Sequence, residues 1–348
     1  METVGAIGAV ERRPGWIPLD RCGGCGSDRA KTFGRAQDLA LLRCGACRLV
    51  RFEAIAPPDV VYQPGYHDGD NEYGWRYTEQ SRQEYELAVA HRRLEWVETH
   101  QRRGSMVDIG GGAGHVVAAA SERGWTATLV EPVSSTVAFA TREFGIHAVC
   151  GGIEHVETGA DQYDLISLVH VLEHFPEPVE RLSNLRPRLA EGGALFVEVP
   201  NYRSMARRWL GDGWMGWRSG EHVHQFTRRT LTATLERAGY DVVATRTMVP
   251  AWDGLGPAAN AHFLGVERIL NRVVTRRHDR LRKHAGAHDA SPAAEAVDDA
   301  WQPAAPRPVR ESRGLRRVVY AGGFSALRAL EEATGTGTNL LALARPKS

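Results

Sequence analysis

The chain has 348 residues, of which 43% are hydrophobic and 24% charged, and 43 basic side chains nearly balance 42 acidic ones. This composition excludes a collagen-like or wholly disordered chain, and a net charge of +1 excludes a whole-chain attraction to polyanions. No apolar run reaches the roughly 18 residues of a membrane-spanning helix, and Glu11, Arg12 and Arg13 interrupt any secretory leader. We therefore expect a cytoplasmic protein built from one large domain and an appendage.

Four of the five cysteines lie in two C-x-x-C pairs near the N-terminus, Cys22 with Cys25 and Cys44 with Cys47. Two such pairs supply four thiolates to a tetrahedral zinc ion, and a site closed by protein ligands stabilises a fold without doing chemistry. A redox C-x-x-C would not need a second pair, and a cytosolic chain would not keep two disulfides oxidised. We predict a structural zinc ribbon over residues 1–52 and a small buried side chain at Cys150.

After the ribbon, a connector and helical lid are expected at 53–103, ending in a helix over 79–100. The pattern then alternates short apolar runs with helical stretches. Strands are predicted at 105–109, 126–130, 147–150, 165–169 and 194–199, and helices at 116–123, 134–143 and 179–189. Strands separated by helices indicate βαβ units, so residues 104–348 are predicted to form a doubly wound, mostly parallel seven-stranded α/β sheet.

Two insertions interrupt this domain. A tryptophan-rich segment covers 201–226, and a second insertion covers 250–335. The second contains a basic amphipathic helix at 260–283, where peripheral contact with a membrane or a lipid-linked substrate is the alternative to a solvated face. Its Ala/Pro-rich part, 286–314, is expected to be disordered. The remaining predicted elements are a helix at 230–238, a strand at 242–248, a helix at 324–334 and a strand at 339–344.

The first strand of the sheet runs into a glycine-rich turn, VDIGGGAG at 107–114, before a helix. Turns at the carboxyl ends of parallel strands bind ligands in open α/β sheets. The dinucleotide fingerprint G-x-G-x-x-G fails here, because His115 stands where its last glycine would be. The residues spell D-x-G-x-G-x-G, with Asp108 followed by Gly110, Gly112 and Gly114. This resembles motif I of class I S-adenosylmethionine (SAM) dependent methyltransferases, whose glycines let the backbone approach the methionine moiety.

A carboxylate, Glu131, follows the second strand 23 residues after Asp108, where it can accept hydrogen bonds from both ribose hydroxyls. The resemblance implies Glu131 as the ribose ligand and Asp108 near the amino acid part of SAM. It also implies an adenine site flanked by Gly152, Ile153 and Glu154, and a pocket closed by Val169 and His170.

Downstream motifs extend the resemblance over residues 105–245. The segments HVLEHFPEP at 170–178 and EGGALFVEVPN at 191–201 are similar to ubiquinone-pathway-type O-methyltransferases. The ribbon and EHVHQFT at 221–227 are similar to bacterial sugar methyltransferases, including zinc-containing deoxysugar C-methyltransferases. In that group two histidines are site residues, which carry over to His222, as proposed base, and His174. The C-methyltransferases have a long further C-terminal domain that we do not expect here, so sugar C-methylation is the alternative to O-methylation.

Methyl transfer to a hydroxyl or carbon acid requires removal of a proton, which suits histidine because its pKa lies near working pH. We nominate His222 as the general base, Glu221 as its orienting acid, and His174 or His224 as substrate contacts. Each histidine could instead be a hydrogen-bonded structural residue. Glu173 is expected to tether a loop, and a divalent ion held with His174 and His222 is the alternative. The tryptophans of the first insertion either wall an acceptor pocket or pack the insertion onto the sheet: Trp209, Trp214 and Trp217.

The sequence is compatible with more than one function. The first is a SAM-dependent methyltransferase acting on a sugar, a glycan precursor, a nucleotide-linked or lipid-linked sugar or a secondary metabolite. The second is a zinc-ribbon rRNA methyltransferase, which is disfavoured because the ribbon has a thin basic patch and only Phe33 for base stacking. A SAM-binding scaffold would need a damaged donor loop, and the loop is intact. The sequence identifies neither the acceptor nor the oligomeric state.

Overall fold

The computed structural model describes residues 15–61, 80–250 and 329–347. The predicted basic helix at 260–283 and the Ala/Pro-rich stretch at 286–314 lie outside the described residues. Of the helix predicted at 324–334, the part at 329–333 is described and is helical. Among the described helices, none is both long and apolar enough to span a bilayer.

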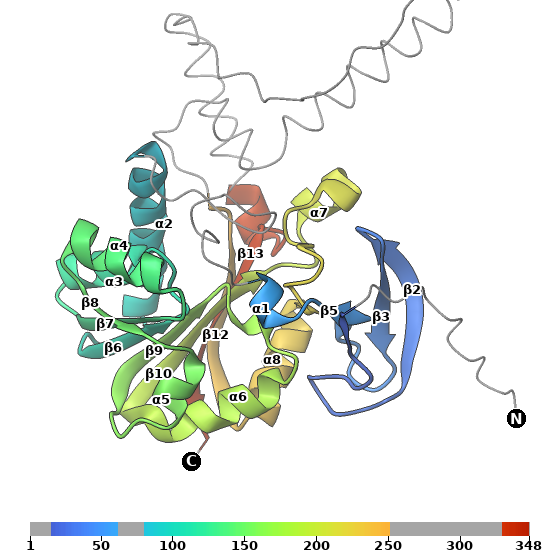
Figure 1. Cartoon of the computed structure of the whole chain (residues 1–348), viewed down its shortest axis with the longest axis horizontal. Helices are drawn as coiled ribbons and strands as arrows, with labels where there is room; N and C mark the ends of the chain where they lie inside the picture. Colours follow the sequence, from blue (N-terminus) through green and yellow to red (C-terminus); the bar gives the residue numbers. More distant parts are fainter. Residues whose placement is uncertain (1–14, 62–79, 251–328, 348) are drawn as a thin grey trace, which may run out of the picture.

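A seven-stranded sheet forms the centre of the molecule, in the order β12-β13-β10-β9-β6-β7-β8 (Figure 1). Strands β6 to β10 are parallel, and β13 pairs antiparallel with both β10 and β12. The strands are β6 (Ser105–Ile109), β7 (Thr126–Glu131), β8 (His147–Cys150), β9 (Tyr163–Val169), β10 (Leu189–Pro200), β12 (Tyr240–Met248) and β13 (Asn339–Pro346). The predicted doubly wound, mostly parallel sheet is confirmed.

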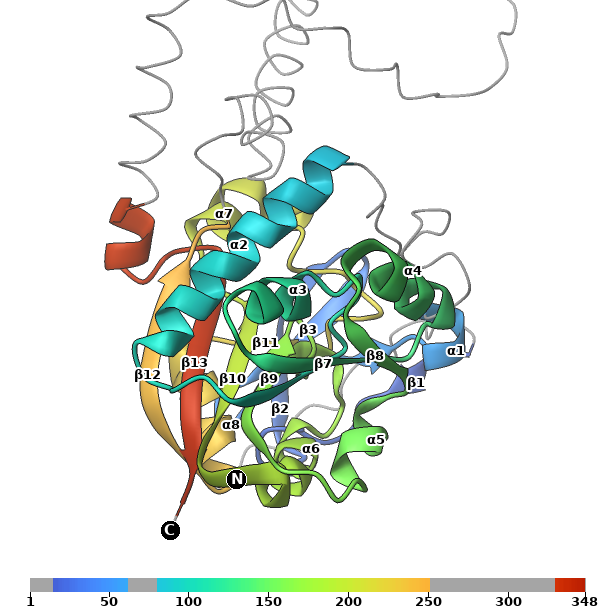
Figure 2. The same ribbon diagram turned by 90° about the vertical axis from the view of Figure 1, so that its left-hand side faces the viewer.

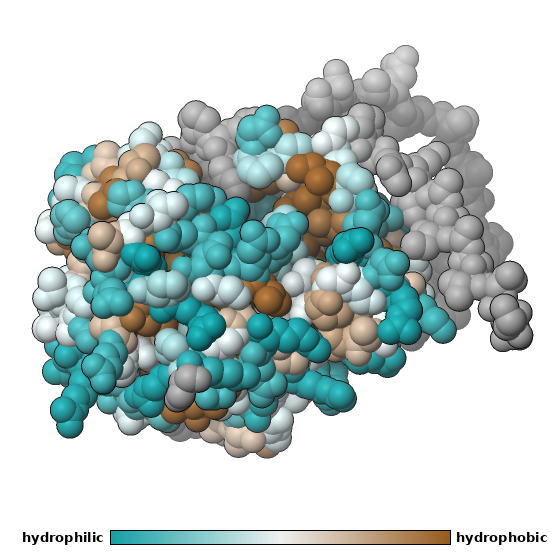
Figure 3. Space-filling model, turned by 90° about the horizontal axis from the view of Figure 1, so that it is seen from below, coloured by the Kyte–Doolittle hydropathy of each residue, from teal (hydrophilic) through white to brown (hydrophobic). Residues whose placement is uncertain are grey.

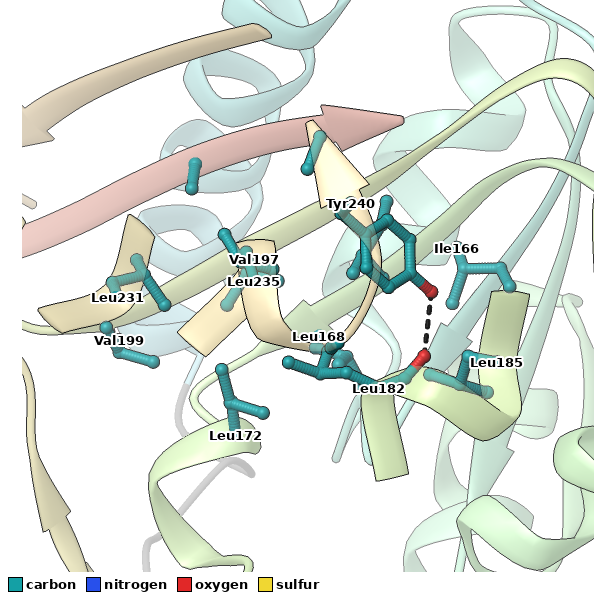
Figure 4. Packing of buried hydrophobic residues seen from close by; sticks show 14 of the residues in the cluster. Ile166, Leu168, Leu172, Leu182, Leu185, Val197, Val199, Leu231, Leu235 and Tyr240 are labelled. Carbon is teal, nitrogen blue, oxygen red and sulfur yellow. Dashed lines mark hydrogen bonds between the residues drawn. The ribbon is translucent and has the colours of Figure 1, made fainter. Parts of the chain in front are cut away.

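Helices cover both faces of this sheet (Figure 2). On one face lie α2 (Gln80–Glu98), α3 (His115–Glu122) and α4 (Ser134–Phe144), and on the other lie α5 (Ile153–Glu157), α6 (Pro178–Leu185) and α8 (Arg228–Arg237). Each layer has its own apolar cluster, one containing Leu94 and Val117 and the other Leu182 and Leu235. In the second cluster the buried Tyr240 hydroxyl donates a hydrogen bond to the carbonyl of Leu182 at 2.8 Å (Figure 4).

The cysteine segment forms a small sheet beside α8 and the first insertion (Figure 1). Its order is β11-β4-β3-β2. The edge strand β11 comes from the first insertion, about 170 residues after its partner β4 in the sequence. The strands are β2 (Ala30–Ala36), β3 (Leu39–Cys44), β4 (Val50–Phe52) and β11 (His224–Gln225). Further short elements are the β1 (Ile17–Pro18) and β5 (Ala54–Ile55) pair, α1 (Pro58–Val61) and α7 (Met205–Leu210). The pairing of β11 with the ribbon is a contact that no sequence pattern predicted.

Two expectations about local structure are wrong. The helix predicted at 179–189 ends at Leu185, and β10 already begins at Leu189. Between them Pro187 lacks the N–H that a helix interior requires, and the chain makes a 3-10 turn instead. Cys150 is exposed rather than buried, because β8 is the edge strand of the sheet.

Two of the three tryptophans in the first insertion are buried and the third is exposed. Trp214 and Trp217 are buried against ribbon residues such as Phe52, whereas the side chain of Trp209 is 53% exposed. The face of the molecule seen from below is mostly hydrophilic, with apolar side chains in small patches (Figure 3). Scattered exposed apolar groups of this kind are ordinary for a folded protein.

Helix α2 is held to the sheet by a buried ion pair. The Arg93 guanidinium donates to both carboxylate oxygens of Glu198 on β10, at 2.9 and 2.8 Å, and the side chains are 7% and 0% exposed. Asn339 on β13 donates to the same carboxylate at 2.6 Å. Burial alone would raise the pKa of Glu198, but Arg93 and His170 hold it well below its ordinary range. The carboxylate is therefore ionised and joins three separate elements.

We expect Arg93→Met to destabilise the protein by roughly 3–5 kcal/mol, because it leaves the Glu198 carboxylate buried without its cation. The matched control is Glu122→Ala, which removes the exposed partner of the His91–Glu122 pair, where the glutamate side chain is 62% exposed. An exposed pair contributes about 0–1 kcal/mol. Urea unfolding measures both, and equal losses in the two variants would contradict the assignment.

Candidate active site

The glycine loop lies between β6 and α3 at the carboxyl edge of the parallel strands. Gly110, Gly112 and Gly114 all have left-handed backbones, with φ of 66°, 55° and 83°. A Cβ on Gly110 would lie 2.8 Å from Val171 Cγ2, and one on Gly114 would lie 2.6 Å from Ile146 Cδ1. Side chains at these positions would be strained as well as blocked. The loop therefore presents bare backbone at this edge of the sheet.

Glu131 ends the neighbouring strand β7 and faces this loop. Its side chain is almost completely buried, and its two oxygens accept hydrogen bonds from the amides of Gly112 at 3.1 Å and Val133 at 3.0 Å. The carboxylate is thereby held against the backbone of the glycine loop and of the turn that follows β7. The ribose-binding role of Glu131 stays a prediction.

Asp108 lies beneath the glycine loop rather than on its surface. The side chain is fully buried, and the Ser167 hydroxyl donates to its Oδ1. Oδ2 has no hydrogen-bond partner in the described structure and would lie 2.2 Å from a Cβ on Gly111. Burial raises the pKa of Asp108 to about 7. Asp108 thus supports the loop from within the sheet, and Gly111 is a further position where only hydrogen fits.

The other predicted cofactor residues surround this edge with different exposures. Ile153 is buried in the core at the start of α5, whereas the next residue, Glu154, points outward and pairs with Arg181 at 3.3 Å. Val169 ends β9 and is partly buried. His170 follows it with a φ of 56°, which is rare for a residue with a side chain.

His170 lies between two buried carboxylates. Its Nδ1 is 3.3 Å from Glu173 Oε1, and its Nε2 is 3.2 Å from Glu198 Oε1. Burial alone would lower the pKa of His170, but the hydrogen bonds to Glu173 and Glu198 raise it to about 9. The imidazole is therefore a cation at neutral pH and holds the end of β9 against β10.

A second group of side chains comes together from distant segments. Glu173 and His174 lie in a 3-10 turn after β9, and His222 comes from the first insertion. The rings of His174 and His222 meet edge to face with centroids 4.7 Å apart. His222 Nε2 is 3.9 Å from Glu173 Oε1, and its Nδ1 is 3.0 Å from the carbonyl of Gly216. The structure thus brings His174 and His222 together, while their role in a site stays a prediction.

The Gly216 carbonyl determines which nitrogen of His222 carries the proton. A carbonyl oxygen only accepts hydrogen bonds, so Nδ1 is the protonated nitrogen and Nε2 carries the lone pair. Burial lowers the pKa of His222 well below its ordinary value, and burial also lowers the pKa of His174. Both imidazoles are therefore neutral at neutral pH. Glu173 is fully buried, and its Oε2 has no hydrogen-bond partner in the described structure.

Glu221 and His224 have hydrogen-bond partners other than those expected from the sequence. Glu221 accepts three hydrogen bonds from the Arg218 guanidinium at 2.7 to 3.1 Å. His222 Nδ1 donates to the Gly216 carbonyl and not to Glu221. The carboxylate near His222 is Glu173. His224 Nε2 lies 3.2 Å from the carbonyl of Pro176, toward the ribbon, and burial lowers its pKa to about 4.

Two clusters contain the donor groups of metal sites. The ligand atoms of Glu173, His174 and His222 lie within 4.8 Å of one another. The 3.9 Å between His222 Nε2 and Glu173 Oε1 exceeds the roughly 3.4 Å between ligands of one zinc ion, so these groups would have to move closer to hold it. The four ribbon sulfurs fit better, with Cys22 to Cys47 and Cys25 to Cys44 both 3.5 Å apart, close to the roughly 3.8 Å of a tetrahedral thiolate site.

Sequence reasoning missed the residues that position this edge of the sheet. Ser167 donates to Asp108, and Glu198 lies 3.2 Å from His170 while it is itself bound by Arg93 and Asn339. Glu198 was quoted within a motif but received no role. A charged residue inside an otherwise apolar strand was the available signal, since such residues are rarely buried without a partner.

Part of the chain matches a known protein family. Residues 77–245 match the family described as Methyltransferase domain. Over 101 residues the chain is 28% identical to ubiquinone biosynthesis O-methyltransferase from Coxiella burnetii, which covers 28% of this chain and 43% of the relative. The chain thus spans less than half the length of that curated relative.

Solved structures similar to the chain are also methyltransferases. A SAM-dependent methyltransferase from Archaeoglobus fulgidus is 14% identical, with a TM-score of 0.45 over 77% of this chain and 99% of that one. The plantazolicin methyltransferase BpumL in complex with SAH is 12% identical, with a TM-score of 0.42 over 78% of this chain and 92% of that one. The family match coincides with most of the sheet described above, so residues 77–245 are similar to a methyltransferase domain in both sequence and fold.

We expect His170 to stabilise the protein only below alkaline pH. Its pKa in the folded state, about 9, lies above the ordinary 6.5, so its contribution is fully present below about pH 6.5 and is lost as pH rises through about 9. The comparison is His170→Asn, because asparagine tolerates the left-handed backbone. Urea unfolding of both proteins between about pH 6 and pH 10 measures the difference. A stability gap that stays constant over this range would contradict the charged state of His170.

Proposed function

We propose that this protein transfers the methyl group of SAM to a hydroxyl of a small-molecule acceptor, such as a sugar, a glycan precursor or a secondary metabolite. One observation carries the proposal. The bare glycine loop with its buried Glu131 lies at the same edge of the sheet as a neutral histidine whose unprotonated Nε2 is 3.9 Å from a buried carboxylate. A methyl donor and a proton acceptor are the two groups that this reaction requires.

The donor half of the site is the glycine loop with Glu131. In this proposal Gly110, Gly112 and Gly114 lie against the amino acid part of SAM, and Glu131 accepts hydrogen bonds from the ribose. Ile153 and Glu154 would flank the adenine, and Val169 and His170 would close the pocket. SAM supplies an electrophilic methyl group. The protein's part is to align it and exclude water.

The acceptor half is the His222 and Glu173 pair, with His174 as a substrate contact. His222 Nε2 takes the proton from the acceptor hydroxyl, while the Gly216 carbonyl keeps the ring oriented. The imidazolium formed in this step lies close to the Glu173 carboxylate, whose charge stabilises it. Glu221 has a different task in this scheme, because its ion pair with Arg218 stabilises the turn that carries His222.

We assign zinc to the four ribbon cysteines, where a tetrahedral set of thiolates leaves no position for a substrate. Small molecules are the favoured acceptors over RNA. The Arg43 guanidinium lies 4.2 Å above the Phe33 ring and so covers the aromatic face that a base would need. The ubiquinone-pathway relative supports oxygen as the acceptor atom. Sugar C-methylation is the second candidate, because the same base would serve a carbon acid.

The donor half is tested by calorimetric titration of the purified, zinc-replete protein with SAM and S-adenosylhomocysteine. We expect binding to the wild-type protein and its loss in Glu131→Ala, with bound zinc unchanged. The control Glu122→Ala, which alters an exposed glutamate on α3, should bind normally. Failure of the folded wild-type protein to bind either compound would refute the methyltransferase function.

The acceptor half is tested with the first acceptor that a screen identifies. His222→Gln should lower kcat by roughly 10²–10⁴-fold, because a positioned general base contributes that much. Its affinity for SAM should stay at the wild-type value. The control His147→Gln changes an exposed histidine on the edge strand β8 and should leave kcat unchanged. Full turnover by His222→Gln would show that another group removes the proton.

A further inference from the structure

We propose that the four-cysteine ribbon is a positioning element for the proton-accepting half of the site, and not only a separately folded appendage. The inference rests on the proposed function, since it assigns the ribbon a role toward His222. It is carried by three independent sets of contacts, which connect the ribbon to the segments that bear His222 and His174.

The first connection is the backbone of the ribbon sheet. Strand β11 pairs with β4, with His224 opposite Arg51 and Gln225 opposite Val50. The pairing continues toward His222 because the amide of Phe52 donates to the carbonyl of Val223 at 3.0 Å. Further hydrogen bonds join Ala56 N to Gly220 O at 3.0 Å and Ser219 N to Gln37 Oε1 at 2.9 Å. Residues on both sides of His222 in the sequence are thus hydrogen-bonded to the ribbon or to its connector.

The second connection is the first cysteine turn. Gly23 lies between Cys22 and Cys25, and a Cβ there would be 2.1 Å from the carbonyl of Pro176 and 2.6 Å from His224 Nε2. Pro176 follows His174 by two residues, and His224 follows His222 by two. The turn therefore packs its backbone directly against both histidine-bearing segments, at the point where His224 and Pro176 meet. A metal that closes the cysteine turn would also hold this backbone in place.

The third connection runs through aromatic packing to the tautomer of the base. Phe52 on β4 is fully buried, and its ring lies 6.1 Å from that of Trp217. Trp217 packs edge to face with Trp214 at 5.1 Å. Gly216, whose carbonyl orients His222, lies between these two tryptophans in the chain. Moving Phe52 would therefore move the carbonyl that keeps the lone pair on Nε2.

The glycine loop packs mainly on other parts of the central domain. A Cβ on Gly114 would meet Ile146, Ala140 and Leu129, whereas one on Gly110 would meet Val171, three residues before His174. The ribbon should consequently affect the two halves of the site differently. Disturbing it should displace the histidines while leaving SAM binding in place.

The test uses Gly23→Ala, with Gly34→Ala in β2 as the matched control, because a Cβ on Gly34 would meet nothing within 4 Å. The readouts on full-length protein are bound zinc, SAM affinity by calorimetry and the imidazole NMR signals after histidine-selective labelling. His174→Gln and His222→Gln assign those signals. We expect Gly23→Ala to keep zinc and SAM affinity but to shift the signals of His174 and His222 and to speed hydrogen exchange at the Phe52 amide. Gly34→Ala should change none of these.

A second pair of variants keeps the proposal testable if Gly23→Ala does not fold. Phe52→Leu should shift the His222 signal, whereas Phe33→Leu, at a ring that is 38% exposed, should not. Unchanged histidine signals in both folded test variants, or equal shifts in their controls, would overturn the positioning role. If the wild-type protein does not bind SAM, the proposed function is refuted, so the two failures are distinguishable.

Discussion

The buried carboxylate of Glu198 is the constraint on which much of this edge of the sheet depends. It lies inside the sheet on β10 and is bound by Arg93 from α2, His170 from the end of β9 and Asn339 from β13. A single ionised carboxylate in an apolar interior requires such partners, because desolvation would otherwise favour the neutral, protonated form. The same carboxylate therefore fixes a helix, an antiparallel strand and the turn that leads to Glu173 and His174. The proton-accepting part of the proposed site would be built on that turn.

Local signals predicted the central sheet and its glycine-rich turn well. The glycine loop, its strand and Glu131 lie within one βαβ unit, where strand ends, turn residues and the spacing of the carboxylate are all readable from the chain. The mostly parallel, doubly wound sheet could be predicted because the alternation of strands and helices restricts the topology. Pro187 shows where attention to one residue would have improved the prediction, since it marked the end of α6.

The parts that escaped prediction depend on contacts between distant residues. Nothing in the sequence near His222 indicates that β11 pairs with a ribbon strand about 170 residues earlier. For the same reason Glu221, the neighbour of His222 in the chain, seemed its natural partner. In the fold Glu221 turns to Arg218, and Glu173 from another segment faces the imidazole. Glu221 and His222 both lie in a turn whose amides bond to the Arg218 carbonyl, and this turn directs the Glu221 carboxylate to the Arg218 guanidinium.

The two halves of the site consequently rest on different supports. The glycine loop, where we propose that the cofactor binds, is part of the central domain, whereas the proposed acceptor half lies between a turn fixed by Glu198 and an insertion bonded to the ribbon. Because the supports are separate, substitutions in the ribbon or in the insertion can alter acceptor geometry without altering the glycine loop. A closed cysteine site suits this purpose, since four ligands on one ion hold two turns rigidly in a segment too small to build a large core. The ribbon would then contribute to catalysis without touching the reacting atoms.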